Sequence, residues 1–266
     1  MSGDILIRGL ELLCAWSVLL QTLEYWRIRG STDPDGVWSW PIQRADIPDS
    51  AQRMKRLLDV VFLPMGYRSL LIIRGVAAWF LAVQGASLGV ALSLFVCQLL
   101  LLIRWRGAFN GGSDFMTLVT LSGILIAQVL LCFVDSAMAW GAGLCYIAIH
   151  TLSSYFVSGW VKVKRPEWRT GQALTVFLNS GLYGPLPPDS LFRRPWVAGC
   201  CSWAFILWEG VFPWVLFKPD WVALFSGIAI LFHFLVFWFF GLNRFFWAWI
   251  VNLSSLFFLI HVLNLH

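Results

Sequence analysis

The chain has 266 residues, of which 59% are hydrophobic and 12% are charged, and it carries a formal net charge of +5. Soluble domains contain about 45–50% apolar and about 25% charged residues, so this composition excludes an ordinary soluble domain. The positive charge lies in the loops, which suits anionic lipid headgroups better than nucleic acid. We therefore expect an all-α, polytopic membrane helical bundle that contacts membrane lipid and has no nucleic-acid partner.

Hydrophobic segments divide the chain into about eight predicted transmembrane helices, each judged against the roughly 20 apolar residues that a span needs. The first covers about Ile5–Leu23 and contains Arg8 and Glu11, which share one helical face and are expected to form an ion pair. The other spans are expected at 69–83, 86–103, 115–134, 139–161, 196–217 and 221–240, with a last one that ends at His261. We expect 1–266 to be a single transmembrane domain without an extramembrane domain.

The long polar connection at 27–68 is predicted to contain an amphipathic helix at about Ser50–Gly66. The charged residues of this segment are Arg53, Lys55, Arg56 and Asp59, and the apolar ones are Leu57, Leu58, Val61, Phe62 and Leu63. A helix of this kind most simply lies on the membrane surface, so we expect an interfacial anchor.

A second polar connection, FNGGSD at 109–114, separates the third and fourth predicted spans. Asn110 and the two glycines after it predict a turn. Asp114 is expected to cap the following helix from its first turn.

Polar residues recur at every fourth position of the predicted span at 139–161. They are Tyr146, His150, Ser154, Ser158 and Lys162. In lipid such a stripe should face other helices or a water-filled cavity, and interhelical hydrogen bonding fits it as well as a functional site does. Lys162 ends the stripe, where an ammonium can also snorkel to the interface.

Two more ionisable residues lie inside predicted spans. Glu209 occurs in WEGVFP, beside Gly210 and one helical turn before Pro213, where a kink is expected. It is predicted either to pair with a buried cation or to be protonated and neutral. His233 lies near the middle of its span, where a lone histidine is most often a hydrogen-bonded core residue. The cysteines and histidines do not have metal-ligand spacing, so no metal site is predicted.

Four sequence pieces occur in an order and spacing that resemble a known family. They are FNGGSDF at 109–115, YFVSGWVKVKRPEWRTGQAL at 155–174, WEGVFP at 208–213, and His233 with GLNRFFWAWI at 241–250. Together they resemble the horizontally transferred transmembrane domain (HTTM) family, the membrane region shared with vitamin K-dependent gamma-carboxylases. The second piece is the most specific, because it combines an aromatic residue, a small-Gly pair, a lysine and a tryptophan.

The resemblance implies that Lys162 is the catalytic base, because it matches the carboxylase lysine associated with coupling hydroquinone oxygenation to proton abstraction from glutamate. A reduced quinone would then be the cosubstrate. Tyr155 and Trp168 belong to the same element and join the candidate site. The carboxylases carry an asparagine–histidine pair in the turn where this chain has Asn110 followed by glycine. They also carry a large extramembrane domain, which is not expected here.

The family also contains short bacterial members, some linked to the maturation of exported peptide toxins, and this chain is closer to those in size. We therefore expect a bacterial inner-membrane protein, with a small exported peptide and an accessory protein as partners. Two functions are considered. One is a carboxylase-like or peptide-maturation enzyme with Lys162 as base, in which Asp114, Glu209 and His233 are secondary polar groups. The other is a non-catalytic membrane partner that anchors or presents a peptide to an accessory protein.

The distribution of Lys and Arg predicts the orientation in the membrane. These residues are concentrated in the connections at 27–68, 104–113 and 161–195, which lie on one side if there are eight spans. The positive-inside rule places these connections in the cytoplasm and both termini outside. This orientation is opposite to the lumenal chemistry that the resemblance to the carboxylases implies.

Overall fold

Each of the eight predicted spans forms a helix in the computed structural model, which describes residues 3–106 and 111–263. The eight helices are α1 (Gly3–Arg27), α4 (Pro64–Gln84), α5 (Leu88–Trp105), α6 (Gly111–Leu130), α7 (Ser136–Lys164), α10 (Pro195–Val211), α11 (Val222–Phe240) and α12 (Asn243–Leu263). By length and apolar composition, seven of them can cross a membrane, α1 being outside this group. The protein is thus an all-α polytopic membrane bundle, because in lipid only a helix or a closed barrel satisfies the backbone internally.

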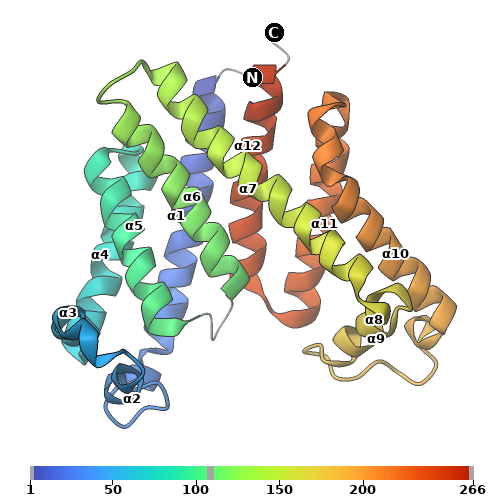
Figure 1. Cartoon of the computed structure of the whole chain (residues 1–266), viewed down its shortest axis with the longest axis horizontal. Coiled ribbons are helices and arrows are strands. Elements are labelled where there is room, and N and C mark those ends of the chain that lie inside the picture. Colours follow the sequence, from blue (N-terminus) through green and yellow to red (C-terminus); the bar gives the residue numbers. More distant parts are fainter. Residues whose placement is uncertain (1–2, 107–110, 264–266) are drawn as a thin grey trace.

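The helices form two groups that share α7 and α12 (Figure 1). In the first group α1 packs against α4 and α12, α4 against α5, and α5 against α6. In the second group α10 packs against α7, and α11 packs against α12. The 29-residue α7 runs obliquely across both groups, so one helix carries side chains into each of the two cores (Figure 1).

The two charged residues of α1 connect it to the turn between α4 and α5. Arg8 and Glu11 form the predicted ion pair, with 3.0 Å between Nη1 and Oε2. Arg8 also donates to the carbonyl oxygen of Leu81 at 3.1 Å, and Glu11 accepts from the amide of Ala86 at 2.8 Å. Arg8 donates to the carbonyl oxygen of Ala82 as well, so the pair adds side-chain hydrogen bonds to the last turn of α4 and to the turn that follows it.

The polar connection at 27–68 contains two short helices, α2 (Trp40–Ala45) and α3 (Gln52–Phe62). The predicted amphipathic helix is α3, but its apolar residues do not all face one environment. Leu58 and Phe62 pack with Trp40, whereas Leu57 and Val60 are exposed. The helix lies against the end of the bundle, so one part of its apolar surface is covered by protein and the rest is available to lipid.

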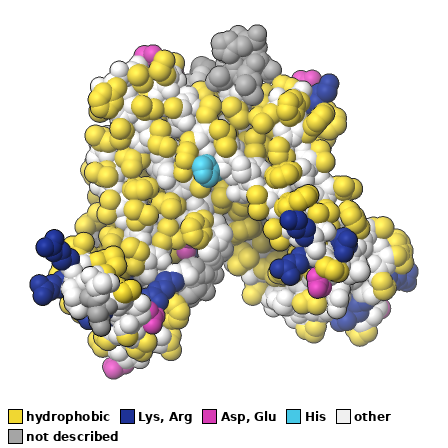
Figure 2. All heavy atoms as spheres, viewed as in Figure 1, with side chains coloured by type: hydrophobic (Ala, Val, Ile, Leu, Met, Phe, Trp, Pro, Cys, Tyr) yellow, Lys and Arg dark blue, Asp and Glu magenta, His cyan; other side chains and the backbone are white. Residues whose placement is uncertain are grey.

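Lys and Arg side chains gather on two lobes at one end of the bundle, one around α2 and α3 and one around α8 (Pro166–Arg169) and α9 (Gln172–Asn179) (Figure 2). The opposite end, where α1 begins, carries Arg8 and Lys218. The first turn of α1 and the last turn of α12 lie at that same end (Figure 1). The structure thus has the charge asymmetry on which the predicted orientation depends.

Candidate functional site

The Lys162 ammonium points into the protein. Its Nζ donates hydrogen bonds to Glu209 Oε1 at 2.7 Å and to Ser158 Oγ at 2.6 Å. It also lies 5.2 Å from the centroid of the Trp168 ring, within the range of a cation–π contact. The Lys162 side chain is 15% exposed and that of Glu209 4%. Of the two roles predicted for Glu209, the geometry favours that of a partner for a buried cation. The Lys162 side chain turns towards Glu209 and does not snorkel to the membrane surface.

Two glycines bring α7 and α10 close enough for this ion pair to form. A Cβ atom on Gly159 would lie 2.6 Å from the backbone nitrogen of Gly210 and 3.0 Å from its Cα, so the two backbones are in contact. Small residues at a helix crossing allow this close approach in membranes. Gly210 follows Glu209 directly and Gly159 precedes Lys162 by three residues, so the crossing places the two charged side chains opposite each other.

The segment after α7 holds Trp168 beside the ion pair. Pro166 starts the short helix α8, and Gly171 turns the chain with a left-handed φ of +80°. A Cβ atom on Gly171 would overlap the backbone of Ala198, and Ser202 donates a hydrogen bond to the carbonyl oxygen of Trp168. These contacts fix α8 on α10, which explains why a tryptophan in a polar loop can cover a lysine on α7.

Tyr155 and His233 form a second pair on the same side of α7. The Tyr155 hydroxyl lies 2.7 Å from Nε2 of His233, and both side chains are buried. Tyr155 precedes Lys162 by seven residues, or about two helical turns. Its ring stacks on Phe212, with centroids 4.2 Å apart and planes 7° apart, and lies 4.9 Å from the ring of Trp249. His233 thus has one hydrogen-bonded nitrogen, whereas its Nδ1 is buried without a partner among the described residues.

Asp114 belongs to a different buried cluster, in the first group of helices. Its carboxylate accepts hydrogen bonds from the Tyr25 hydroxyl at 3.1 Å and from Arg244, which also lies 3.5 Å from Glu24. Asp114 lies in the first turn of α6, where a capping role was expected, and its side chain extends to α1 and α12; the residues directly before α6 lie outside the described part of the chain. A buried guanidinium binds a carboxylate more strongly than a backbone amide does. No hydrogen bond or ion pair links Asp114 to Lys162 within the described part of the chain.

The sequence reasoning missed the buried arginine that extends this cluster. Arg74 is fully buried and donates to Gln21 Oε1 at 2.9 Å, Gln98 Oε1 at 2.8 Å and Thr22 Oγ1 at 2.7 Å. Gln98 in turn donates to the carbonyl oxygen of Asp114 at 3.0 Å. A sequence signal existed, because these glutamines and Arg74 lie inside predicted spans, where polar residues normally face one another.

The predicted polar stripe on α7 does not share one environment. His150 is exposed, and its Nδ1 is bonded to the carbonyl oxygen of Tyr146 in its own helix at 2.9 Å. Ser154 contacts the sulfur of Met116, and only Ser158 and Lys162 reach Glu209. A four-residue spacing advances about 40° round the helix at each step, so the stripe turns from the surface into the bundle. His150 is thus not brought together with Lys162, and Asn110 lies outside the described residues.

Comparisons of this chain with protein-family models, with curated proteins and with solved structures found no match. The resemblance to the HTTM family rests on the four sequence pieces quoted above.

Proposed function

We propose that this protein is a membrane enzyme in which Lys162 removes a proton from a substrate, with Glu209 as its proton partner. The observation that carries the proposal is the ion pair between these residues, which is withdrawn from solvent and lies at the end of a membrane helix. Ionisable pairs inside membrane segments commonly serve proton transfer or substrate binding. The resemblance to the HTTM family, in which Lys162 matches the catalytic lysine, supports the same residue independently of the geometry.

The chemistry requires a neutral amine. The ammonium of Lys162 first gives a proton to the Glu209 carboxylate, which lies within hydrogen-bond distance at 2.7 Å. This leaves an amine with a free electron pair and a neutral carboxylic acid, a state that avoids the cost of desolvating two charges. The amine then takes a proton from an acidic C–H or O–H group of the substrate. The products are the ammonium and a substrate anion, so protons and charge balance.

The aromatic cluster near Lys162 does not by itself provide a place for the reduced quinone that the resemblance implies. The Tyr155 ring is stacked against Phe212 and contacts Trp249, so these rings pack against one another. We derive no step through a quinone. The substrate class that we propose is a small exported peptide, matured at the membrane in a bacterial cell.

The test compares two substitutions of Lys162 in the native host. Lys162→Ala removes the amine. Lys162→Arg keeps a cation for Glu209 but introduces a guanidinium that stays protonated. Mass spectrometry of secreted peptides should show that both variants lose the modified product by about 100-fold or more, the usual contribution of a general base. The exposed Lys164, two residues further along, is the matched control, and Lys164→Ala should retain the product. Full activity of Lys162→Arg would reject the base role.

One observation favours the alternative of a non-catalytic membrane partner. The Lys162 ammonium already has three partners, namely Glu209, Ser158 and Trp168, as a structural ion pair would. In that case Lys162→Arg preserves the ion pair and the function, and an accessory protein co-purifies with the chain in stoichiometric amount. The same pair of substitutions therefore separates the two functions.

A further inference from the structure

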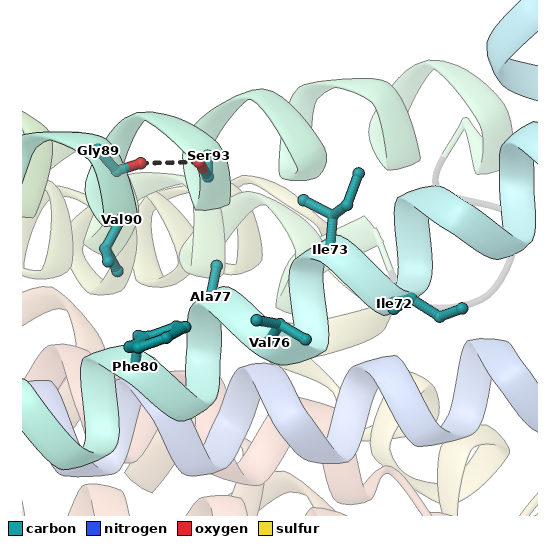
Figure 3. Close-up of a pocket in the computed structure, with 8 residues that line it drawn as sticks. All are labelled: Ile72, Ile73, Val76, Ala77, Phe80, Gly89, Val90 and Ser93. Atoms are coloured by element: carbon teal, nitrogen blue, oxygen red, sulfur yellow. Dashed lines mark hydrogen bonds between the residues drawn. The ribbon is translucent and has the colours of Figure 1, made fainter.

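A long apolar groove lies between α4 and α5. These two helices belong to the first group of helices, whereas Lys162 lies between α7 and α10. Its first part is a cavity of about 300 Å³ where Ile73, Val76 and Phe80 of α4 face Gly89, Val90 and Ser93 of α5 (Figure 3). Gly89 and Ser93 have small side chains, which leave space between α4 and α5 for the cavity. Figure 3 also shows that the Ser93 hydroxyl is bonded to the carbonyl oxygen of Gly89, which leaves an apolar surface.

A second cavity continues the first towards α3. It has a volume of about 460 Å³, and its lining includes Val60 of α3, Gly66 and Ser69 of α4, and Leu100 of α5. Ile73 and Ser93 line both cavities, so the two form one groove. From Gly66 to Phe80 the groove follows fourteen residues of α4, or about 21 Å at 1.5 Å per residue. One leaflet of the hydrocarbon core is about 15 Å thick, so an extended acyl chain fits along the groove.

Unpaired positive charge lies at the α3 end of this groove. Arg56 and Arg53 precede Val60 by four and seven residues, and they therefore share its face of α3. Both are exposed, and neither has a carboxylate partner among the described residues. Arg44 and Arg106 of the same lobe, by contrast, pair with Asp59 and Asp46. The groove thus joins an apolar channel to two free guanidinium groups at its end.

We propose that this groove is a binding site for an anionic phospholipid. One acyl chain lies between α4 and α5, and the phosphate is held by Arg53 and Arg56. A guanidinium binds a phosphate through two parallel hydrogen bonds. The phosphate of a zwitterionic lipid binds the two arginines less strongly, because the cation of the same headgroup competes for it. The site differs from general lipid contact in requiring both the groove and the two arginines.

The test uses the full-length protein purified in detergent and titrated with phosphatidylglycerol or phosphatidylcholine, with native mass spectrometry and melting temperature as readouts. Each arginine near a membrane surface contributes roughly fivefold in affinity for anionic lipid, so Arg53→Gln/Arg56→Gln should weaken phosphatidylglycerol binding roughly 25-fold. Arg165→Gln/Arg169→Gln removes two charges from the α8 lobe and should have little effect. Ser93→Phe should block the groove, with Leu231→Phe on the exposed face of α11 as its control.

Gly89→Leu provides a second blocking variant that the fold accommodates, because a Cβ atom at this position meets open space. The proposal predicts that either blocking variant lowers phosphatidylglycerol retention without lowering the melting temperature of lipid-free protein. Equal retention of phosphatidylcholine and phosphatidylglycerol would overturn it. So would an equal shift in melting temperature with glycerol phosphate, which carries the same anion without acyl chains.

Discussion

The ammonium of Lys162 and the carboxylate of Glu209 meet at 2.7 Å although 47 residues separate them in the chain. One comes from the last turn of α7 and the other from the C-terminal part of α10. The meeting depends on the backbone contact between Gly159 and Gly210 and is covered by Trp168. Position, pairing and cover are the three features on which the proposed role of Lys162 rests.

Breaking the ion pair on one side is expected to destabilise the protein. Glu209→Leu leaves the ammonium of Lys162 without its carboxylate, which should cost about 3 kcal/mol, the lower end of the range for buried pairs, because Lys162 keeps some exposure. Lys162→Met/Glu209→Leu removes both charges and should recover most of that loss. Denaturant unfolding in detergent measures both. A double variant that is less stable than Glu209→Leu would contradict this account.

The glycine crossing predicts opposite effects for two Gly→Ala substitutions in α7. Gly159→Ala forces a methyl group into the backbone of Gly210 and should cost about 1–3 kcal/mol by overpacking. Gly141→Ala places its methyl group in open space and should stabilise the helix by up to about 1 kcal/mol. Unfolding free energies of the two variants give the comparison. Equal values would mean that the crossing does not depend on glycine.

Substitution of Asp114 should destabilise the protein more than substitution of Glu24, the partly exposed second partner of Arg244. Asp114→Asn removes the negative charge that balances Arg244 and should cost about 3–5 kcal/mol, since both side chains are buried. Glu24→Gln affects the same guanidinium from a partly exposed position and should cost less than about 1 kcal/mol. Thermal unfolding of the two variants tests the ranking. The reverse order would show that Glu24 is the main partner of Arg244.

The α2–α3 lobe should lose stability in acid because of Asp59. Hydrogen bonds from Arg44 and then from Trp40 lower the pKa of Asp59 below its usual value. A lowered carboxyl pKa contributes stability above the unfolded-state pKa of about 3.9, and this contribution is lost as the pH falls through the folded-state pKa. The difference in melting temperature between the wild-type protein and Asp59→Asn should therefore shrink below about pH 4. Asp35→Asn, an exposed change in the same connection, is the control and should show no such trend.

Cysteine labelling tests the orientation. The positive-inside rule places α2, α3, α8 and α9 in the cytoplasm. The native Cys132 and Cys200 are exposed, so both are first replaced by serine. In that background a membrane-impermeant thiol reagent added outside intact cells should label Phe133→Cys, in the turn between α6 and α7, and leave Val37→Cys unlabelled until the cells are opened. Both positions are well exposed, with 78% and 85% of the residue surface accessible. The reverse pattern would instead match the facing of the carboxylases.

The fold could be predicted from the sequence because it depends on local properties. A run of about 20 apolar residues must become a helix in lipid, where its backbone has no other way to form hydrogen bonds. The ion pair of Arg8 and Glu11 was also predictable from local properties, because residues three positions apart in a helix lie on the same face. The position of Lys162 at the end of a span was also evident from the sequence.

Only the tertiary structure decided which polar residues meet. The sequence left Glu209 either paired with a buried cation or protonated, and its pairing with Lys162 depends on how closely α7 and α10 pack at Gly159 and Gly210. Asp114 was expected in the first turn of its helix, but only the positions of α1 and α12 give its carboxylate Tyr25 and Arg244 as partners. His150 shares the spacing of Lys162, yet a slow rotation of the stripe turns it outward. Hydropathy and spacing determine what a helix must satisfy by itself, whereas pairing between helices depends on packing distances that distant parts of the chain determine together.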